Sequence, residues 1–279
     1  MALINFNFES QYLSNAHNVT IIMPDKPRDD NAKEFYTSGK KYRVLWLLHG
    51  SYDDGAGWLR RTMAEVYARE KNLIIVMPSA LNSNYVNWDD FGTGFRMGDY
   101  LTEELMPVIH NWFPASSRKE DNFIAGNSMG GSGSLKYILQ HPDKFAAAAI
   151  LSSAPYDPDE INWDGKDPTE RKSAANSRFV NTLKNLGGKE EYYKSIENTW
   201  GRIIEMHNAG TLPKLMFACG QKDFGYDDYK KFETMCNEKG IKAEFYELPD
   251  LGHEWRFWDK SLQKAIEFFG ITEKGFVIF

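Results

Sequence analysis

Long apolar runs are missing from this chain of 279 residues. No segment approaches the roughly 18 consecutive apolar residues that a membrane-spanning helix requires. The first residues, Met1 to Phe6, also lack the cationic start and the apolar stretch of a secretory signal. We therefore expect a cytoplasmic protein with no membrane partner. A chain from which a signal peptide had been removed would give the same pattern.

Cysteine is scarce, with only Cys219 and Cys236 in the whole sequence. Cys219 lies in an apolar run typical of a core strand, so a disulfide framework is not indicated and a reducing compartment suits the chain. We expect both thiols to be inert packing residues.

Clusters of positive charge are absent too. The formal net charge is -6, and the Lys and Arg residues are scattered among acids. This distribution lacks the basic patch that nucleic acids or anionic membranes require. The sequence therefore predicts no nucleic-acid partner and favours neutral or cationic substrates.

Motifs for metals and nucleotides are also lacking. His253 is followed by Glu254, but no second histidine follows at the spacing of a zinc helix. The glycine-rich stretch from Gly130 to Gly133 has no lysine at the phosphate-binding position of a nucleotide loop. We expect neither a metal nor another cofactor.

The chain does contain enough apolar sequence for one large core, with hydrophobic residues at 42%. Short apolar runs alternate with longer amphipathic ones, a pattern typical of parallel strands joined by crossover helices. We therefore predict a single α/β domain over residues 1–279 with a mostly parallel central sheet flanked by helices. The predicted strands are residues 44–48, 73–77, 123–125, 146–151, 215–219 and 243–248, with an antiparallel start near 19–23.

Three helices follow from apolar spacing, besides a final helix after the last strand. One spans Leu59 to Tyr67, a second begins near Ser132, and a third begins with Asp99 as its N-cap and is kinked at Pro107. The apolar faces of the first and third are Leu59, Met63, Val66 and Tyr67, and Leu101, Leu105, Val108 and Trp112.

Residues 155–200 break the alternation, because they are polar and rich in Asp, Asn and Lys. We predict that they form a small cap-like insertion over the carboxyl edge of the sheet, where open α/β folds bind ligands.

The stretch from Gly126 to Gly130 has the form of a nucleophile elbow, with Ser128 at its centre. It follows the apolar run from Phe123 to Ala125 and precedes a helix, so Ser128 would lie on a strand-to-helix turn. Small flanking residues avoid a clash in such a turn, and the serine hydroxyl points toward substrate. The alternative is a tight structural turn with a solvated hydroxyl.

A serine hydroxyl needs a base and a group that orients the base. On this fold the expected chain order is Ser, acid, His. Asp223 follows one predicted strand and His253 follows the next, so both would reach the same sheet edge as Ser128. The alternatives are a helix-capping role for Asp223, with Asp227 and Asp228 as competing acids, and a surface role for His253. The other four histidines with poorer contexts, for which we expect structural roles, are His17, His110, His141 and His207.

The pair His49-Gly50 follows a predicted strand and precedes Ser51. Acyl transfer places negative charge on a carbonyl oxygen, and backbone N–H groups can stabilise that charge by about 3 kcal/mol each. We assign these oxyanion N–H groups to Met129, next after the nucleophile, and to Ser51. The alternative for His49-Gly50 is a turn that merely closes a strand.

Together these motifs resemble the esterase D type of α/β-hydrolase, which includes S-formylglutathione hydrolases, feruloyl esterases and the antigen 85 mycolyltransferases. The resemblance is strongest to bacterial tributyrin esterases and covers almost the whole chain. It implies the α/β-hydrolase fold, with Ser128 as nucleophile, Asp223 as acid and His253 as base. Tributyrin esterases often have methionine where Ser51 stands here. The motifs that carry the resemblance are Trp46 to Gly50, Gly126 to Gly130, Cys219 to Phe224 and Gly252 to Trp255.

The resulting hypothesis is a serine carboxylesterase that hydrolyses short-chain acyl or hydroxycinnamoyl esters through an acyl-enzyme. A thioesterase of the S-formylglutathione kind, an acyltransferase and a non-catalytic hydrolase-fold binding protein are the alternatives. We expect a small-molecule ester as partner, with an acylated sugar as one candidate, and we leave a homo-oligomer open. The aromatic residues predicted to line the substrate pocket are Tyr85, Trp88, Trp163 and Phe91.

Overall fold

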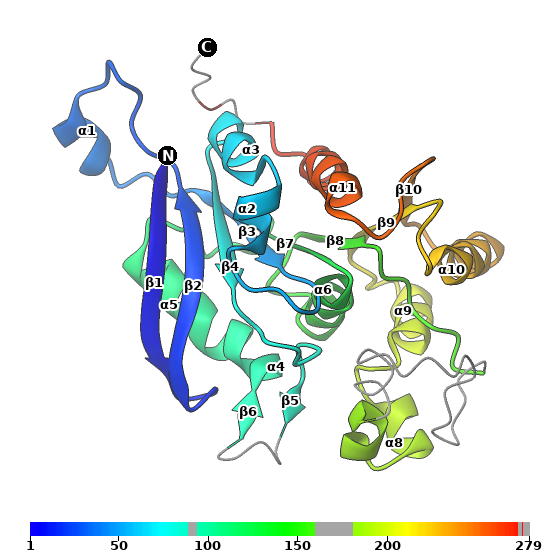
Figure 1. Cartoon of the computed structure of the whole chain (residues 1–279). Coiled ribbons are helices and arrows are strands. Elements are labelled where there is room, and N and C mark those ends of the chain that lie inside the picture. Colours follow the sequence, from blue (N-terminus) through cyan, green and yellow to red (C-terminus); the bar gives the residue numbers. More distant parts are fainter. Residues whose placement is uncertain (89–93, 160–180, 273–274, 276–279) are drawn as a thin grey trace.

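A computed structural model of the chain describes residues 1–88, 94–159, 181–272 and 275. Its main sheet has eight strands in the order β1-β2-β4-β3-β7-β8-β9-β10. In this order the six strands from β4 to the last, β10, pair in parallel (Figure 1). At the other edge β1 pairs antiparallel with β2, and β2 pairs antiparallel with β4. The mostly parallel sheet and its antiparallel start were both predicted. The strands are β1 (Ala2–Ser10), β2 (Asn15–Met23), β3 (Arg43–Leu48), β4 (Leu73–Pro78), β7 (Asn122–Asn127), β8 (Ala147–Leu151), β9 (Lys214–Gly220) and β10 (Glu244–Leu248).

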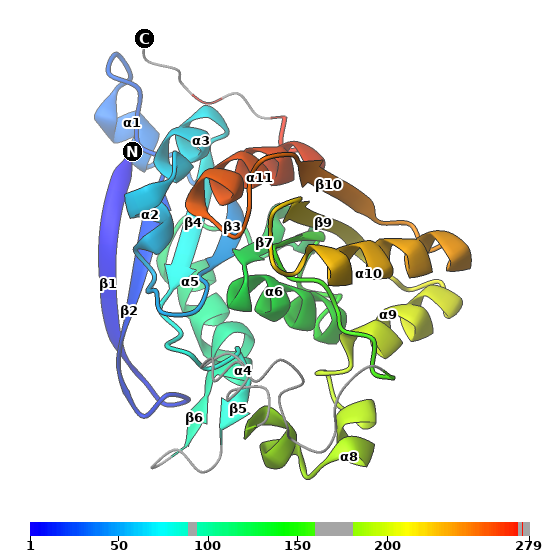
Figure 2. The same cartoon turned by 45° about the vertical axis from the view of Figure 1, so that its right-hand side comes forward.

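Helices cover both faces of the sheet (Figure 2). Because side chains alternate along a strand, Trp46 of β3 packs with the core on one face and Leu47 packs with the core on the other. The first core contains α5 (Met106–Trp112), α6 (Met129–Gln140), α9 (Thr199–Asn208) and α10 (Tyr226–Lys239), and the second contains α2 (Gly57–Arg61), α3 (Ala64–Glu70) and α11 (Trp255–Phe268). The shorter elements are α1 (Ala32–Tyr36), α4 (Met97–Asp99), α8 (Lys189–Lys194), the 3-10 turn Lys119–Asp121 and the ribbon of β5 (Asn87–Trp88) with β6 (Phe95–Arg96).

The helix predicted from Leu59 to Tyr67 is two helices. Thr62 has an extended backbone and ends α2, so the helical spacing is not continuous across it. As a result Met63 and Val66 are exposed, and Ala64 and Ala68 are the residues of α3 that are buried. Leu59 and Tyr67 are partly buried against the second core as predicted, so the predicted apolar face was wrong only at Met63 and Val66.

The helix predicted to start at Asp99 is present, but its first residue and its buried face differ from the prediction. It begins at Met97, and no side chain caps it, so Asp99 is not the N-cap. A π-helical segment, Tyr100–Leu105, lies between α4 and α5. A π turn holds more residues than an α turn, so the positions after it are rotated. Leu101 and Leu105 are buried as predicted, but Met106 and Ile109 are buried in place of Val108 and Trp112.

The described part of the predicted insertion, residues 155–159 and 181–200, includes α8 and the start of α9. The α9 helix packs against α6 (Figure 2). Residues 160–180, with Trp163, lie outside the described residues, as does Phe91. No helix in the described part of the chain is long and apolar enough to cross a membrane.

Candidate active site

Ser128 lies on a sharp turn between the central strand β7 and the helix α6. Its backbone angles are φ 53° and ψ -119°, a region that costs energy for any residue with a side chain. The turn is held by the Ser128 N–H, which donates to the Leu151 carbonyl at 2.8 Å. A Cβ at Gly126 or at Gly130 would lie 2.4 Å from a backbone oxygen, so both positions require glycine. The strand, turn and helix are those that the motif predicts.

His253 and Asp223 form a hydrogen-bonded pair beyond the ends of β10 and β9. Nδ1 of His253 lies 2.9 Å from Oδ2 of Asp223, and the Gly225 N–H donates to Oδ1 at 2.9 Å. An ionised carboxylate only accepts hydrogen bonds, so Nδ1 carries the proton and Nε2 of a neutral ring is left as an acceptor. The Asp223 side chain is 1% exposed and that of His253 is 22% exposed. The carboxylate therefore lies behind the imidazole, which faces the pocket.

Burial and hydrogen bonding act on Asp223 in opposite directions. Burial raises its pKa, but hydrogen bonds from His253, Gly225 and Ser152 lower it, and the net pKa lies below the ordinary value. The Trp258 indole N–H in turn donates to the Ser152 hydroxyl at 3.0 Å. That hydroxyl therefore receives one hydrogen bond and directs its own hydrogen to Asp223. Sequence reasoning missed Ser152, although its place at the end of β8 was a signal.

Two aromatic rings contact the imidazole. Trp258 meets His253 edge-on, with ring centroids 5.1 Å apart, and Phe224 lies on it at 4.5 Å. Together with the Asp223 contact, these rings restrict the orientation of the imidazole.

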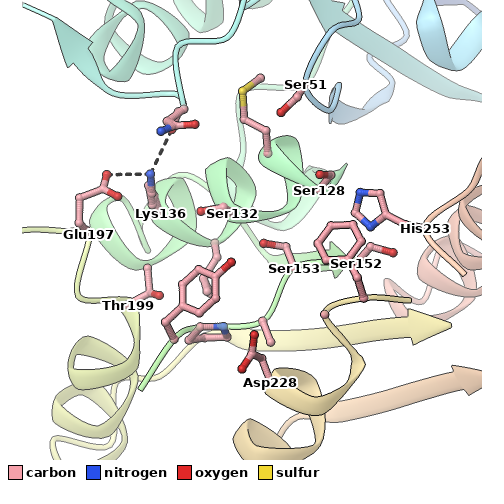
Figure 3. Close-up of a pocket in the computed structure, with 18 of the residues that line it drawn as sticks. Ser51, Ser128, Ser132, Lys136, Ser152, Ser153, Glu197, Thr199, Asp228 and His253 are labelled. Atoms are coloured by element: carbon pink, nitrogen blue, oxygen red, sulfur yellow. Dashed lines mark hydrogen bonds and ion pairs between the residues drawn. The ribbon is translucent and has the colours of Figure 1, made fainter. Parts of the chain in front are cut away.

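Ser128 and His253 line one pocket, of about 210 Å³, in which the imidazole lies beside the hydroxyl (Figure 3). Ser51 and Met129, to which the sequence assigns the oxyanion N–H groups, line the same pocket. Of the competing acids, Asp228 also lines it, but Asp223 is the one that contacts His253. The remaining lining is mixed. Its polar members include Ser132, Lys136, Ser153, Glu197 and Thr199, and its apolar or aromatic members include Leu135, Ala154, Pro155, Tyr156 and Tyr192.

His49 has a structural place next to this pocket. Its Nε2 accepts the Ala80 N–H at 2.8 Å, so Nδ1 carries the proton and donates to the Gly50 carbonyl at 2.7 Å. Burial lowers the pKa of His49 and keeps the ring neutral. The ring thus holds the loop that precedes Ser51.

Two of the four aromatic residues predicted to contact substrate, Tyr85 and Trp88, lie away from this pocket, and the other two lie outside the described residues. Tyr85 is buried, donates its hydroxyl hydrogen to the His49 carbonyl at 3.0 Å, and packs beside α6. Trp88 donates to the Ser83 carbonyl at 2.7 Å and lines a separate surface depression. Periodicity and residue type cannot tell a core or rim aromatic from one that faces substrate, which explains the difference.

A serine on a strand-to-helix turn, at the centre of a mostly parallel sheet, together with a His-Asp pair from later strand ends, defines the α/β-hydrolase class. Over residues 10–269 the sequence matches the family described as Putative esterase, and the chain belongs to this family. The family resemblance in the sequence is thereby confirmed, as is the coarse prediction of an ester hydrolase.

Several known proteins are similar along their whole length. An acetyl esterase of Caldicellulosiruptor saccharolyticus is 28% identical over 96% of this chain and 97% of its own. The crystal structure of an S-formylglutathione hydrolase of Staphylococcus aureus aligns with a TM-score of 0.76 at 27% identity, over 96% of this chain and 98% of the other. A substrate-bound fluorophosphonate-binding serine hydrolase of Staphylococcus aureus aligns with a TM-score of 0.74 at 27% identity, over 98% and 99% of the two chains.

Proposed function

We propose that this protein is a serine carboxylesterase that hydrolyses short-chain acyl esters through a covalent acyl-enzyme. The observation that supports this most is the 2.9 Å contact between Asp223 and His253, whose ring lines the pocket that Ser128 also lines. Ser128 sits on a strained turn, and strain of this kind is concentrated at functional sites.

In the proposed first half-reaction, Ser128 Oγ attacks the ester carbonyl carbon while Nε2 of His253 removes the hydroxyl proton. Asp223 holds the ring in the tautomer that leaves Nε2 free and stabilises the imidazolium that forms. His253 then gives the proton to the leaving alcohol as the carbon–oxygen bond breaks.

In the second half-reaction, water takes the place of the alcohol. His253 removes a proton from the water, which attacks the acyl-enzyme, and Ser128 leaves with that proton as the carboxylic acid is released. The backbone N–H groups of Ser51 and Met129 would stabilise the oxyanion in both steps, at about 3 kcal/mol each. His49 supports this assignment, because it anchors the loop before Ser51.

The direct test is Ser128→Ala with 4-nitrophenyl acetate as substrate. We expect kcat to fall by about 10⁴-fold to 10⁶-fold, because the covalent route is lost while binding and oxyanion contacts remain. A matched control is Ser261→Ala on α11, a buried serine whose hydroxyl has no partner among the described residues. Full turnover by the Ser128→Ala protein would overturn the mechanism.

A thioesterase is the second candidate, because a solved structure that is similar over nearly all of both chains is that of an S-formylglutathione hydrolase. Comparing kcat/KM for S-formylglutathione, 4-nitrophenyl butyrate and methyl ferulate separates this candidate from a short-chain esterase and from a feruloyl esterase. An acyltransferase would instead show product formation that depends on an added alcohol. Failure of a fluorophosphonate probe to label Ser128 would favour the non-catalytic alternative.

A further inference from the structure

One face of α6 lines the pocket from the nucleophile at its start to a lysine further along the helix. Ser128, Ser132 and Lys136 are four residues apart, a spacing that places side chains on the same side of a helix. All three line the pocket, and Lys136 lies along the helix from Ser128 (Figure 3). The far end of the pocket is therefore defined by a cation.

Lys136 is buried and paired with Glu197, which comes from the segment between α8 and α9. Nζ lies 2.7 Å from Oε1 of Glu197, and the two side chains are 6% and 11% exposed. Oε1 accepts no hydrogen bond of good geometry from a described residue, so the contact is an ion pair. Nζ also donates to the Asn84 carbonyl at 3.1 Å. An ammonium group has three N–H donors, and its contacts with Glu197 and Asn84, those given among the described residues, leave at least one for another acceptor.

A buried ion pair is a costly way to stabilise a fold. Removing two charges from water offsets most of their attraction, and apolar residues of similar size are often as stabilising or more so. Stability therefore gives little reason for Lys136 and Glu197 at this place. Their position in the wall of the pocket gives a better reason for their presence, because charged groups there can contact a bound ligand.

The pair also indicates the chemistry of that ligand. The two opposite charges cancel locally, so the site does not favour a ligand with net charge. An ammonium donor beside a carboxylate acceptor suits a neutral hydroxyl group, which both donates and accepts. The nearby lining adds the hydroxyls of Ser132 and Thr199. A hydrocarbon chain at this end would displace the water that hydrogen-bonds these charged groups and would offer no hydrogen bond in return, which is unfavourable.

We propose that Lys136 and Glu197 bind a hydroxyl group of the substrate and so select esters of hydroxylated compounds over alkyl esters. The proposal rests on the ester hydrolysis proposed above and adds a specificity determinant to it. The hydroxyl can belong to the alcohol, as in an acetylated sugar, or to the acyl group, as in a hydroxy acid.

The test replaces both charges together in Lys136→Met/Glu197→Leu, because a single replacement would leave one buried charge unpaired. The matched control is Lys264→Met/Glu244→Leu, an ion pair at 3.2 Å between α11 and β10. The substrates are a monoacetylated methyl xyloside, 4-nitrophenyl lactate, 4-nitrophenyl acetate and 4-nitrophenyl hexanoate. Thermal unfolding and the rate of fluorophosphonate labelling show whether each variant keeps its folded active site.

We expect the double variant to lose at least about tenfold in kcat/KM for a hydroxylated ester, the effect of losing a hydrogen bond to a charged group. Turnover of 4-nitrophenyl acetate should stay within about threefold, and that of the hexanoate should rise. A loss confined to the xyloside places the recognised hydroxyl on the alcohol, and one confined to the lactate places it on the acyl group.

Equal losses for all four esters, or no loss for either hydroxylated ester, would overturn the proposal. If 4-nitrophenyl acetate turnover still depends on Ser128 in that case, the proposed esterase function stands. A wild-type protein that hydrolyses none of the four esters would overturn both.

Discussion

The hydroxyl of Ser152 accepts a hydrogen bond from Trp258 and donates one to the Asp223 carboxylate, which in turn contacts the His253 imidazole. Ser152 adopts φ 53°, a conformation unfavourable for a residue with a side chain, and a hydrogen bond from its hydroxyl lowers the pKa of Asp223. It is thus placed as a positioning residue that acts through Asp223.

Ser152→Ala should lower kcat by about tenfold, because a hydrogen bond to a charged group contributes about 1.5–3 kcal/mol. In the folded wild type the pKa of Asp223 lies below that of an ordinary Asp. The ionised carboxylate therefore contributes fully to stability at pH values above the ordinary pKa. That contribution is lost as the pH falls through the lowered pKa of the folded state. Without the Ser152 hydrogen bond that pKa rises. The acid-side loss of activity and of stability should then begin at higher pH.

A pH profile of kcat/KM, together with urea unfolding at several pH values, measures this shift. Ser153→Ala is the matched control, since Ser153 lines the same pocket and no hydrogen bond from it is among those that lower the Asp223 pKa. A Ser152→Ala profile that superimposes on the wild type would contradict the role of Ser152.

At the scale of elements, the start of α6 packs closely against the ends of β7 and β3. Gly130 packs on the carbonyl end of β3, where an added Cβ would lie 2.4 Å from the Leu48 oxygen. The helix can approach the sheet this closely only without a side chain at that position.

Gly130→Ala should lower the free energy of unfolding by about 2 kcal/mol or more, because a backbone oxygen cannot move aside as a flexible side chain can. Activity should fall as well, since the turn that holds Ser128 must shift. Urea denaturation and 4-nitrophenyl acetate turnover measure the two effects. At Gly225 the added Cβ would lie 3.6 Å from Asp223 Oδ1, an ordinary contact, and we expect Gly225→Ala to cost about 1 kcal/mol or less. Equal costs at the two glycines would contradict this account.

The π-helical segment before α5 shows why the buried face of a helix cannot always be predicted from sequence. Leu101 and Leu105 are buried as their spacing predicts, whereas Trp112 is exposed. A prediction from apolar spacing assumes a constant number of residues per helical turn. The wider π turn between α4 and α5 changes which residues after it face the core. Only the packed structure contains that information.

At the scale of the whole molecule, both cysteines lie in the core. Cys219 is on β9 and Cys236 is on α10, and both are buried. Burial raises the pKa of Cys236 to about 12 and raises that of Cys219 as well. Thiolates rather than thiols react with alkylating reagents, so both groups should be inert in the native protein, as the sequence predicts for packing residues.

Iodoacetamide should therefore leave the native protein unmodified and fully active, and should modify both thiols in denaturant. Because the two cysteines belong to one core cluster, their labelling rates should rise together with global unfolding. Mass spectrometry across a urea series measures both sites in one experiment. Rapid labelling of one site under native conditions would show local opening of that part of the core.

The amino-acid sequence by itself determined the fold class, the family and the positions of β2 and the parallel strands, but not the edge strand β1. Local constraints explain this, because alternating apolar runs specify strands and the glycines around Ser128 specify its turn. The chain order predicted that Ser128, Asp223 and His253 reach one sheet edge, and the tertiary structure alone decided their contacts and the other groups that line the pocket. Asp223 and His253 are 30 positions apart, and their 2.9 Å contact depends on two strands ending at one edge. Lys136 meets Glu197 across 61 positions for the same reason, since side chains distant in sequence come together only when helices and strands pack.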